Sequence, residues 1–467
     1  MPRTKIVCTI GPSSSSPEVI RELVKSGMDV ARLNFSHGTH KEHEEKIRII
    51  RAVSDQLGKP VAILQDLCGP KIRVGNVAEP GMHLKPGQTF ILTSEQVMGS
   101  ENRVSVSYPT LPSEVKNGDI ILLADGMLEL VVKKTNRTEI YCKVITGGVL
   151  TSHKGINLPS GTIKMDALTP KDIEDLLFGL KNDVDYVGLS FVRRAEDILK
   201  LKDIIKREKK DTPVIAKIEK HEALDNIEEI MEVSDGVMVA RGDLGVEIPL
   251  EDVPNIQKML VCKANVLGKP VIIATQMLRS MVDSPRPTRA EATDVANGVL
   301  DGADAVMLSE ETAIGKYPVK AVRFMARIAE SAEKIYPYEK YLQLISKKGI
   351  SESVAYASCI LADNLDASAI VATTRSGFTA KHISRFRPKT KIIALSPDKV
   401  TVRRLSLYWG CLPSFVPDSK DTDDLFEKTS SFALATGNVS KGDVIVITTG
   451  HPVWVAGTTN MMRVKRL

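Results

Sequence analysis

Short apolar segments that alternate with helical stretches constrain this chain more than any other feature. The residues between most of these segments show helical periodicity, as in Pro17–Ser26 and His40–Leu57. Strands that alternate with helices form a parallel sheet, and eight such units predict a closed (β/α)₈ barrel, or TIM barrel. The eight predicted strands are Lys5–Ile10, Val30–Phe35, Val61–Leu67, Tyr186–Phe191, Val214–Glu219, Gly236–Ala240, Val271–Thr275 and Ala305–Leu308.

The segment between the third and fourth predicted strands interrupts this pattern. Residues 70–166 are rich in Val, Thr and Gly, contain turn signals such as Pro86-Gly87 and Asn117-Gly118-Asp119, and lack helical periodicity. We therefore expect a small all-β domain inserted in a loop of the barrel. The barrel itself would then comprise residues 1–69 and 167–335.

The pattern changes again after residue 335. Four more strand candidates alternate with helices, and they are Ala369–Thr373, Lys391–Leu395, Leu412–Val416 and Val444–Thr448. This alternation predicts a separate C-terminal α/β domain, residues 336–467, with an open parallel sheet. A chain of 467 residues is long enough for several hydrophobic cores.

Composition argues against several classes of protein. A net charge of +5 over 467 residues does not indicate a dedicated nucleic-acid-binding protein. The six cysteines are scattered and form no Cys-x-x-Cys pair, which is typical of a reducing cytoplasm. No apolar run approaches the length of a membrane span, and the N-terminus has no signal-peptide pattern. We expect a cytoplasmic protein with no nucleic-acid and no membrane partner.

Reactive side chains gather at the carboxyl ends of the predicted barrel strands, where (β/α)₈ barrels carry their active sites. These side chains belong to Arg32, Asn34, Ser36, Asp66, Ser190, Lys217, Glu219, Arg241, Asp243 and Thr275, with Arg73 shortly after the third strand. Because the carboxyl ends of all eight strands meet at one mouth, we expect the group to converge there.

The charged members of this group suit phosphoryl transfer. Arg32, Arg73 and Lys217 are cations that could balance the charge of a phosphoryl group. Glu219 and Asp243 offer hard oxygen ligands for Mg²⁺ or Mn²⁺. The apolar run before Asp243 predicts a strand, and the nearby glycines predict a tight turn, so this carboxylate should lie where a strand meets a loop.

The remaining polar residues suggest two further roles. Asn34, Ser36 and Asp66 offer oxygens that would suit a large monovalent cation, and Thr275 places a hydroxyl at the mouth as a possible proton relay. No serine or cysteine in the group has an obvious histidine base beside it, so a covalent acyl mechanism is not indicated.

Six motifs, in matching order and spacing, closely resemble those of the pyruvate kinase family, and the resemblance covers essentially the whole chain. The motifs are Thr9–Pro12, Ala31–Gly38, Ala216–Glu219, Met238–Glu247, Ala274–Leu278 and Met307–Ala313. The resemblance implies an enzyme that transfers the phosphoryl group of phosphoenolpyruvate to ADP, giving pyruvate and ATP in the last step of glycolysis. It also implies a homotetramer under allosteric control.

The resemblance further implies roles for particular residues. The catalytic groups would be Lys217, Arg32, Arg73 and Thr275. Substrate would contact Ser190, Phe191, Lys217, Gly242, Asp243 and Thr275. Nucleotide would contact Asn34, Arg73 and Lys154. The divalent ion would be held by Glu219 and Asp243, and a monovalent ion by Asn34, Ser36, Asp66 and the carbonyl of Leu67.

One departure from the family pattern affects the monovalent ion. Many members carry glutamate where this chain has Lys71. Family members with lysine at this position tend not to need potassium. We therefore expect the ammonium of Lys71 to lie close to Asp66 and to supply the charge that K⁺ would otherwise supply.

A turn in the predicted C-terminal domain resembles the loop with which the family binds the phosphate of an effector. It follows a strand and opens a helix, where backbone amides bind anions. The expected effector residues are Thr373, Thr374, Arg375, Ser376, Gly377 and Thr379.

Two other functions fit parts of this pattern. A metal-dependent lyase that forms pyruvate by cleaving a carbon–carbon bond would share Glu219 and Asp243 but would need neither the inserted domain nor Lys154. A catalytically silent effector-binding protein would be expected to have lost members of the site, and none is missing. Formation of ATP and pyruvate from phosphoenolpyruvate and ADP would separate the three.

Overall fold

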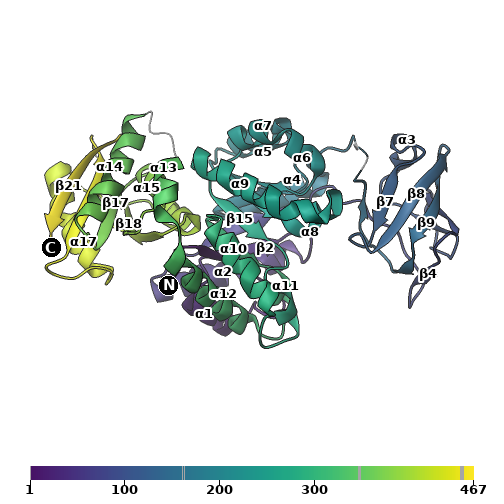
Figure 1. The fold of residues 1–467 in the computed structure, drawn as a ribbon, viewed down its shortest axis with the longest axis horizontal. Coiled ribbons are helices and arrows are strands. Elements are labelled where there is room, and N and C mark those ends of the chain that lie inside the picture. Colours follow the sequence, from purple (N-terminus) through teal and green to yellow (C-terminus); the bar gives the residue numbers. More distant parts are fainter. Residues whose placement is uncertain (1, 160, 162–163, 345–348, 453–456) are drawn as a thin grey trace.

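The chain folds into three bodies in a row, with the barrel in the middle (Figure 1). The computed structural model describes residues 2–159, 161, 164–344, 349–452 and 457–467. The inserted β-domain lies at one end of the molecule and the C-terminal α/β domain at the other. No helix within the described ranges combines the length and the apolar character needed to cross a membrane.

Eight parallel strands close the central barrel, which confirms the predicted fold. In chain order they are β1 (Lys5–Thr9), β2 (Val30–Asn34), β3 (Ala62–Asp66), β12 (Tyr186–Leu189), β13 (Val214–Ile218), β14 (Gly236–Ala240), β15 (Val271–Ala274) and β16 (Ala305–Leu308). Around the barrel the order is β1-β16-β15-β14-β13-β12-β3-β2, so strands adjacent in the barrel sequence are adjacent in space. Nearly all their residues are buried, as expected for a parallel sheet covered by helices.

Helices follow the barrel strands and pack on the outside. The longer ones are α1 (Pro17–Ser26), α2 (His40–Leu57), α4 (Pro170–Lys181), α5 (Ala195–Arg207), α9 (Val253–Leu267), α10 (Arg289–Leu300) and α12 (Pro318–Ala332). Short helices complete this layer: α6 (His221–Asp225), α7 (Ile227–Val233), α8 (Arg241–Glu247) and α11 (Glu310–Ala313). Capping boxes explain why three helices begin where they do: Thr39 with Glu42, Thr169 with Asp172, and Thr288 with Glu291.

The inside of the barrel is a packed apolar core and not a channel. Side chains such as Leu64, Ile215 and Met238 fill it. Leu407, from the short 3₁₀ helix Leu405–Leu407 of the C-terminal part, belongs to the same cluster and is buried. One residue of the C-terminal domain thus contributes to the core of the barrel.

The inserted domain is built of strands, as the sequence predicts. Its strands are β4 (Met82–Leu84), β5 (Thr89–Thr93), β6 (Arg103–Ser105), β7 (Ile120–Leu123), β8 (Leu128–Thr135), β9 (Glu139–Thr146), β10 (Gly148–Leu150) and β11 (Ile156–Asn157). Six form a sheet in the order β11-β7-β8-β9-β5-β6, and β10 pairs with β4. A single turn of helix, α3 (Leu111–Glu114), interrupts them. The apolar residues of this domain form a cluster of their own, separate from the barrel core.

The C-terminal domain differs in one respect from the predicted open parallel sheet. Its helices are α13 (Tyr338–Leu344), α14 (Ile350–Asn364), α15 (Phe378–Arg385), α16 (Lys399–Arg404) and α17 (Thr422–Ala435). The strands are β17 (Ala369–Thr373), β18 (Lys391–Ser396), β19 (Cys411–Phe415), β20 (Val444–Gly450) and β21 (Thr459–Arg466), in the order β19-β18-β17-β20-β21. The expectation of a purely parallel sheet is wrong, because β21 runs antiparallel to β20 and forms the edge.

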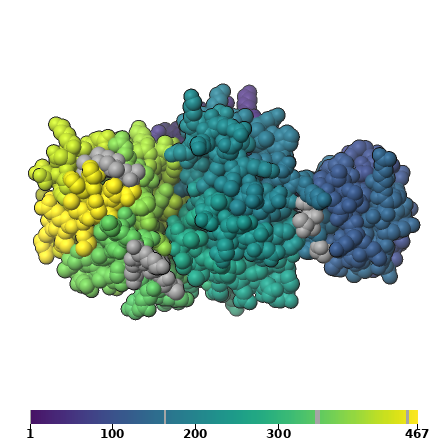
Figure 2. All heavy atoms as spheres, turned by 90° about the horizontal axis from the view of Figure 1, so that it is seen from above, coloured from purple at the N-terminus to yellow at the C-terminus, as the bar shows by residue number. Residues whose placement is uncertain are grey.

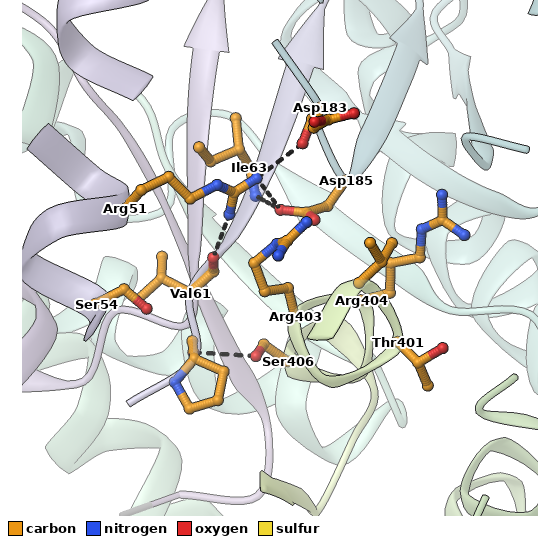
Figure 3. A network of polar contacts seen from close by, with 12 residues as sticks. Arg51, Ser54, Val61, Ile63, Asp183, Asp185, Thr401, Arg403, Arg404 and Ser406 are labelled. Atoms are coloured by element: carbon orange, nitrogen blue, oxygen red, sulfur yellow. Dashed lines mark hydrogen bonds and ion pairs between the residues drawn. The ribbon is translucent and has the colours of Figure 1, made fainter. Parts of the chain in front are cut away.

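Buried ion pairs join the C-terminal domain to the amino end of the barrel. Asp185, just before β12, accepts hydrogen bonds from Arg51 Nη2 at 2.9 Å and from Arg403 Nε of α16 at 2.8 Å (Figure 3). The same carboxylate also accepts a hydrogen bond from the backbone amide of Ile63 at 2.7 Å. The carboxylate of Asp185 therefore joins a residue of the barrel layer to a residue of the C-terminal domain. Each of its two oxygens accepts at least one hydrogen bond.

A second buried pair reinforces this junction. Arg387 is 1% exposed and donates from Nη1 and Nη2 to the two carboxylate oxygens of Asp304, at 2.9 and 2.8 Å. Nη2 also donates to Asn265 Oδ1 at 2.7 Å and to the carbonyl of Gly302 at 3.0 Å. This bidentate pair buries a guanidinium with nearly all its donors satisfied.

The inserted domain is attached differently. Figure 2 shows it as a separate lobe beside the barrel, with a narrow connection. Polar contacts cross this junction in a few places: Lys71 with Asp243, Asn157 with Glu247, Arg193 with the carbonyl of Met165, and Lys200 with Asp166.

Candidate active site

The candidate site lies at the carboxyl ends of the barrel strands, on the side that faces the inserted domain. Arg32 comes from β2, Asp66 from β3, Lys217 from β13, and Glu219 immediately follows β13. Because β2 pairs with β3 and β12 separates β3 from β13, these side chains approach one another across the mouth of the barrel.

Four charged side chains form the centre of the site. Lys217 Nζ lies 3.1 Å from Asp66 Oδ1 and 2.9 Å from Glu219 Oε1. Arg32 Nε donates to the other oxygen of Asp66 at 2.6 Å, and its Nη1 donates to Thr9 Oγ1 at 2.9 Å. Asp66 and Glu219 are 1% and 2% exposed, so the two carboxylates that pair with these cations are buried.

Lys217 is held in its charged form by these neighbours. Burial works against the charge, but Asp66 and Glu219 together raise the pKa of Lys217 above its ordinary value. Asp66 is buried as well, which opposes its charge, yet Lys217 and Arg32 outweigh burial and lower the pKa of Asp66. The site therefore presents a fixed ammonium group near neutral pH.

Ser190 and Phe191 connect this centre to the next strand end. The hydroxyl of Ser190 donates to the carbonyl of Leu67 at 2.8 Å and accepts from Lys217 Nζ at 2.6 Å. The amide of Phe191 donates to Glu219 Oε2 at 2.7 Å. Phe191 has a φ of 55°, a left-handed conformation that a non-glycine residue adopts only where its surroundings enforce it.

Thr275 and Gly242 meet at the ends of β15 and β14. The amide of Gly242 donates to Thr275 Oγ1 at 2.7 Å, and the hydroxyl of Thr275 donates to the carbonyl of Ala274 at 2.6 Å. Thr275 and the next residue, Gln276, have φ values of 71° and 56°. Two consecutive left-handed residues hold the threonine hydroxyl at the mouth, at an energetic cost typical of functional sites.

The expected tight turn around Asp243 is wrong. Strand β14 leads directly into the short helix α8, and Asp243 lies in its first turn. The two glycines, Gly242 and Gly245, are both helical here, since neither has a positive φ. The carboxylate still lies close to the strand end, because a helix rises only about 1.5 Å per residue.

The two carboxylates predicted to bind a divalent ion fit that role chemically. Burial raises the pKa of Glu219 above its ordinary value, and the charge of Asp243 raises it further against the opposing effect of Lys217. A buried carboxylate with a second carboxylate beside it is stabilised as an anion by a hard cation with oxygen ligands. Glu219 and Asp243 are thus suited to hold Mg²⁺ or Mn²⁺.

The residues predicted for a monovalent ion lie in one neighbourhood. Asn34 and Asp66 are opposite each other in the paired strands β2 and β3. Asn34 Oδ1 accepts the amide of Ser36 at 3.1 Å, and the carbonyl of Leu67 accepts the hydroxyl of Ser190. Each of these oxygens already has a partner in the structure, and the Asp66 carboxylate is paired with Arg32 and Lys217.

The structure corrects the expected position of Lys71. Its ammonium does not lie against Asp66 but pairs with Asp243 Oδ1 at 3.2 Å, with Asp125 Oδ1 at 3.8 Å. Asp66 is instead neutralised by Arg32 and Lys217. The reason is geometric: Lys71 follows Gly69 into the inserted segment, so its side chain reaches α8 across the domain junction. The ammonium of Lys71 therefore neutralises a predicted ligand of the divalent ion and not the predicted potassium site.

Arg73 and Lys154 contact the inserted segment and not the charged centre. Arg73 Nη1 donates to the carbonyl of His153 at 3.1 Å, and its amide donates to Ser107 Oγ at 2.9 Å. The carbonyl of Lys154 accepts the amide of Val74 at 2.9 Å. Both cations lie on the segments that lead into and out of the inserted domain.

The predicted effector residues surround a small pocket in the C-terminal domain. Residues 373–376, Phe378 and Thr379 line it together with residues from the β20–β21 end, including Thr449 and Thr459. Gly377 has a φ of 83° and is the N-cap of α15. Thr379 Oγ1 lies 2.7 Å from Thr459 Oγ1, and half-exposed Arg375 lies 3.7 Å from Asp418.

Sequence reasoning missed two residues that the structure brings to this region. Thr9 binds Arg32, and it ends β1, so the strand-end rule that found its neighbours would also have found it. Glu247, at the end of α8, has a fully buried side chain that accepts from Lys220 Nζ at 2.7 Å and from Asn157 Nδ2 at 2.9 Å. Its role could not be read from periodicity, because these partners come from two other parts of the chain.

Comparison with known proteins agrees with this architecture. Residues 1–322 match the family described as pyruvate kinase, barrel domain, and residues 352–465 match pyruvate kinase, alpha/beta domain. The chain is 49% identical over 473 residues to the pyruvate kinase of Staphylococcus haemolyticus, covering 99% of this chain and 80% of the relative. It is also 49% identical over 469 residues to pyruvate kinase 2 of Synechocystis, covering 99% of this chain and 79% of that protein.

These matches span both the barrel with its charged mouth and the C-terminal sheet. The chain belongs to the pyruvate kinase family and is a phosphotransferase.

Proposed function

We propose that this protein transfers the phosphoryl group of phosphoenolpyruvate to ADP and releases pyruvate and ATP, as the last step of glycolysis. One observation carries the proposal. Lys217 is fixed as an ammonium ion between Asp66 and Glu219 at the mouth of the barrel. A preorganised cation in a site with little water stabilises charge that develops on a phosphoryl group in flight.

The roles of the surrounding residues follow from their positions. Arg32, anchored by Asp66 and Thr9, would add a second cation near the phosphoryl oxygens. The substrate would contact Ser190, Phe191, Gly242 and Thr275. The hydroxyl of Thr275, held by two left-handed residues, would lie near the carbon that gains a proton when the enolate becomes pyruvate.

Glu219 and Asp243 would hold a divalent ion, Mg²⁺ or Mn²⁺. Such an ion supplies Lewis-acid stabilisation of phosphoryl and carboxylate oxygens. Because Asp243 is only partly buried and is paired with Lys71, the ammonium of Lys71 would have to move when the ion binds. ADP would contact Arg73, Lys154 and Asn34, of which the first two lie on the segments joined to the inserted domain.

The test of the function is direct. Purified protein is mixed with Mg²⁺, phosphoenolpyruvate and ADP, and ATP and pyruvate are measured. Equal amounts of the two products are expected. Pyruvate without ATP would indicate a lyase or a phosphatase, and no product at saturating substrate would indicate a catalytically silent binding protein.

Potassium would be dispensable if the cations at this mouth suffice. Asp66 already has Arg32 and Lys217 as partners, which balance its charge without a further cation. We expect similar turnover in sodium and in potassium at matched ionic strength, since screening alone changes the kinetics of charged substrates. Activation of many-fold by potassium would show that Asn34, Ser36, Asp66 and Leu67 bind the ion in spite of these cations.

A phosphorylated effector would bind the pocket at residues 373–379. The hydroxyls of its threonines, the start of α15 and half-exposed Arg375 support an anion there. Arg375→Ala should weaken activation by a sugar phosphate and leave maximal turnover unchanged. Unaltered effector binding by calorimetry would move the site elsewhere.

A homotetramer in the cytoplasm completes the proposal, with residues 1–69 and 167–335 as catalytic barrel, 70–166 as a cover for the nucleotide, and 336–467 as regulatory domain. The edge strand β21 exposes about two-fifths of Met462 and of Val464, and edges of this kind pair with other chains. The six cysteines are free thiols, as in a reducing compartment. Light scattering that gives a monomer mass would exclude the tetramer.

A further inference from the structure

A cavity of about 480 Å³ lies between the barrel and the C-terminal domain, away from the candidate active site. Its barrel wall includes Ser234 and Lys269, which precede β14 and β15, so the cavity lies at the amino ends of the strands. The opposite wall includes Lys381, His382 and Arg385 of α15. The volume falls within the range of small-molecule sites, about 300–1,000 Å³.

Three buried polar atoms of residues that line this cavity have no hydrogen-bond partner among the described residues. They are Ser234 Oγ, His382 Nδ1 and Arg385 Nε. Ser234 is 2% exposed and Arg385 is 9% exposed, so water at the surface does not readily serve them. Buried groups of this kind are rare in folded proteins, and several around one cavity indicate a missing partner.

Lys381 adds a positive charge that forms no ion pair within the described part of the chain. Its ammonium lies 5.2 Å from the centre of the Tyr408 ring and makes no hydrogen bond or ion pair with a residue that the structure describes. The two carboxylates that act on Lys381 have other partners: Asp235 is paired with Lys202 at 2.8 Å, and Asp211 with Arg404 at 2.9 Å. Glu232 is exposed at the rim. The cavity thus has an unbalanced cation on one side.

The other cations of the cavity are occupied. Lys269 Nζ donates to the carbonyls of Met231, Glu232 and Ser234. Arg385 uses its two terminal nitrogens on Glu352 and on the carbonyl of Val266, which leaves only Nε. Burial, with a smaller effect from Arg404, lowers the pKa of Lys381, and an anion beside it would remove that cost.

We propose that this cavity is a second regulatory site that binds the phosphate group of a small phosphorylated molecule. The unpartnered groups are an ammonium, a guanidinium N–H, a hydroxyl and an imidazole nitrogen, all of which can donate to phosphate oxygens. The site is separate from the pocket at residues 373–379, although α15 connects the two.

The position of the cavity would allow a bound ligand to affect the reaction at the other end of the barrel. Strands β13, β14 and β15 begin at the cavity, and at their opposite ends lie Lys217, Asp243 and Thr275. The ligand would bridge the first residues of these strands and helix α15. It would therefore favour one arrangement of the barrel relative to the C-terminal domain. That arrangement would in turn affect the positions of the side chains at the mouth of the barrel.

Calorimetry on the full chain tests the site with two probes, ribose 5-phosphate and adenosine 5′-monophosphate, and with ribose and adenosine as phosphate-free controls. We expect at least one phosphorylated probe to bind and neither control to do so. Lys381→Met should weaken binding about tenfold or more, since it removes the charged donor. Exposed Lys391→Met should bind as wild type does. The effector-loop variant Arg375→Ala changes only the pocket at residues 373–379, so it should keep the binding that Lys381→Met loses.

Thermal unfolding provides a second measurement. Lys381→Met should unfold at a higher temperature than wild type without ligand, because a half-buried charge with no ion pair among the described residues is removed, and should lose the upward shift that the probe causes. Ser234→Ala, which only removes a hydroxyl, should reduce that shift as well. The proposal is overturned if neither phosphorylated probe binds wild type, or if both variants keep the full shift.

Discussion

The two ends of the barrel use buried charge in different ways. At the amino end, Arg387 and Asp304 satisfy each other in a bidentate pair, and Asp185 is held between Arg51 and Arg403 (Figure 3). At the carboxyl end, Lys217 is shared between two carboxylates, and Asp243 is paired across a domain junction with Lys71.

The two kinds of pairing have different physical consequences. Pairs that are complete in the free protein stabilise the arrangement of the two domains that they join. Pairs that are shared or partly exposed can be exchanged for a substrate, a metal ion or a nucleotide. The inserted lobe, attached by a few polar contacts, is therefore the part of the molecule most able to change position (Figure 2).

Replacing Lys217 should have the largest effect on function. Lys217→Met removes the cation that would act mainly in the transition state, so turnover should fall by about three orders of magnitude or more, with a small change in KM. Steady-state kinetics and circular dichroism would check activity and folding. Lys200→Met, which removes an exposed pair with Asp166, is the matched control and should keep wild-type turnover. A variant of Lys217 with half the normal turnover would contradict the assignment.

Breaking the amino-end pair should have the largest effect on stability. Arg387→Met leaves Asp304 buried without its partner, which should cost about 3–5 kcal/mol of unfolding free energy. Urea unfolding followed by fluorescence of the adjoining Trp409 measures it. Removing the fully exposed pair of Arg48 and Glu45 by Arg48→Met should change stability far less, because solvent screens that pair. Similar losses in the two variants would mean that the junction is not held by its buried charges.

Removing Lys71 tests the partly exposed pair at the carboxyl end of the barrel. Because its ammonium neutralises Asp243 in the ion-free structure, Lys71→Met should tighten Mn²⁺ binding by about fivefold, equivalent to a pair worth about 1 kcal/mol. Electron paramagnetic resonance titration of free Mn²⁺ gives the affinity. Lys154→Met, on the neighbouring segment, should leave Mn²⁺ binding unchanged. Weaker binding in Lys71→Met would show that the lysine favours the bound ion.

The smallest expected effect concerns pH at the insert junction. Through its hydrogen bond, Glu247 raises the pKa of His221 above 6.5. The resulting stabilisation is present below pH 6.5 and is lost as pH rises through the folded-state pKa. The difference in unfolding free energy between wild type and His221→Asn, under about 1 kcal/mol, should shrink with rising pH. In Glu247→Gln, NMR titration of His221 should give a pKa closer to 6.5, and an unchanged value would exclude this pairing.

The fold could be predicted because its signals are local. Each barrel strand lies within a predicted apolar run, and α1 and α2 match their predicted ranges. Several runs extend one or two residues beyond the strand, since polar residues such as Glu219 leave the sheet to bind elsewhere. Strand β21 was missed because its exposed residues, among them Met462 and Val464, give no buried apolar run.

The site was only partly predictable for the same reason. The sequence indicated which reactive residues end strands, and the barrel brings several of those strand ends together. Their catalytic roles stay predictions. Lys71 could not be paired from sequence, because its partner Asp243 is 172 residues away and the contact depends on how the inserted lobe is oriented.

The sequence by itself determined the order of strands and helices, the family, and the residue types at the mouth, because periodicity and motifs are properties of chain neighbours. Only the tertiary structure decided which charges are paired. In the structure Lys217 pairs with Asp66 and Glu219, Lys71 with Asp243, and Arg387 with Asp304, whereas Lys381 forms no ion pair with any described residue. Electrostatic energy depends on distance and burial, and both are set by contacts between residues far apart in the chain.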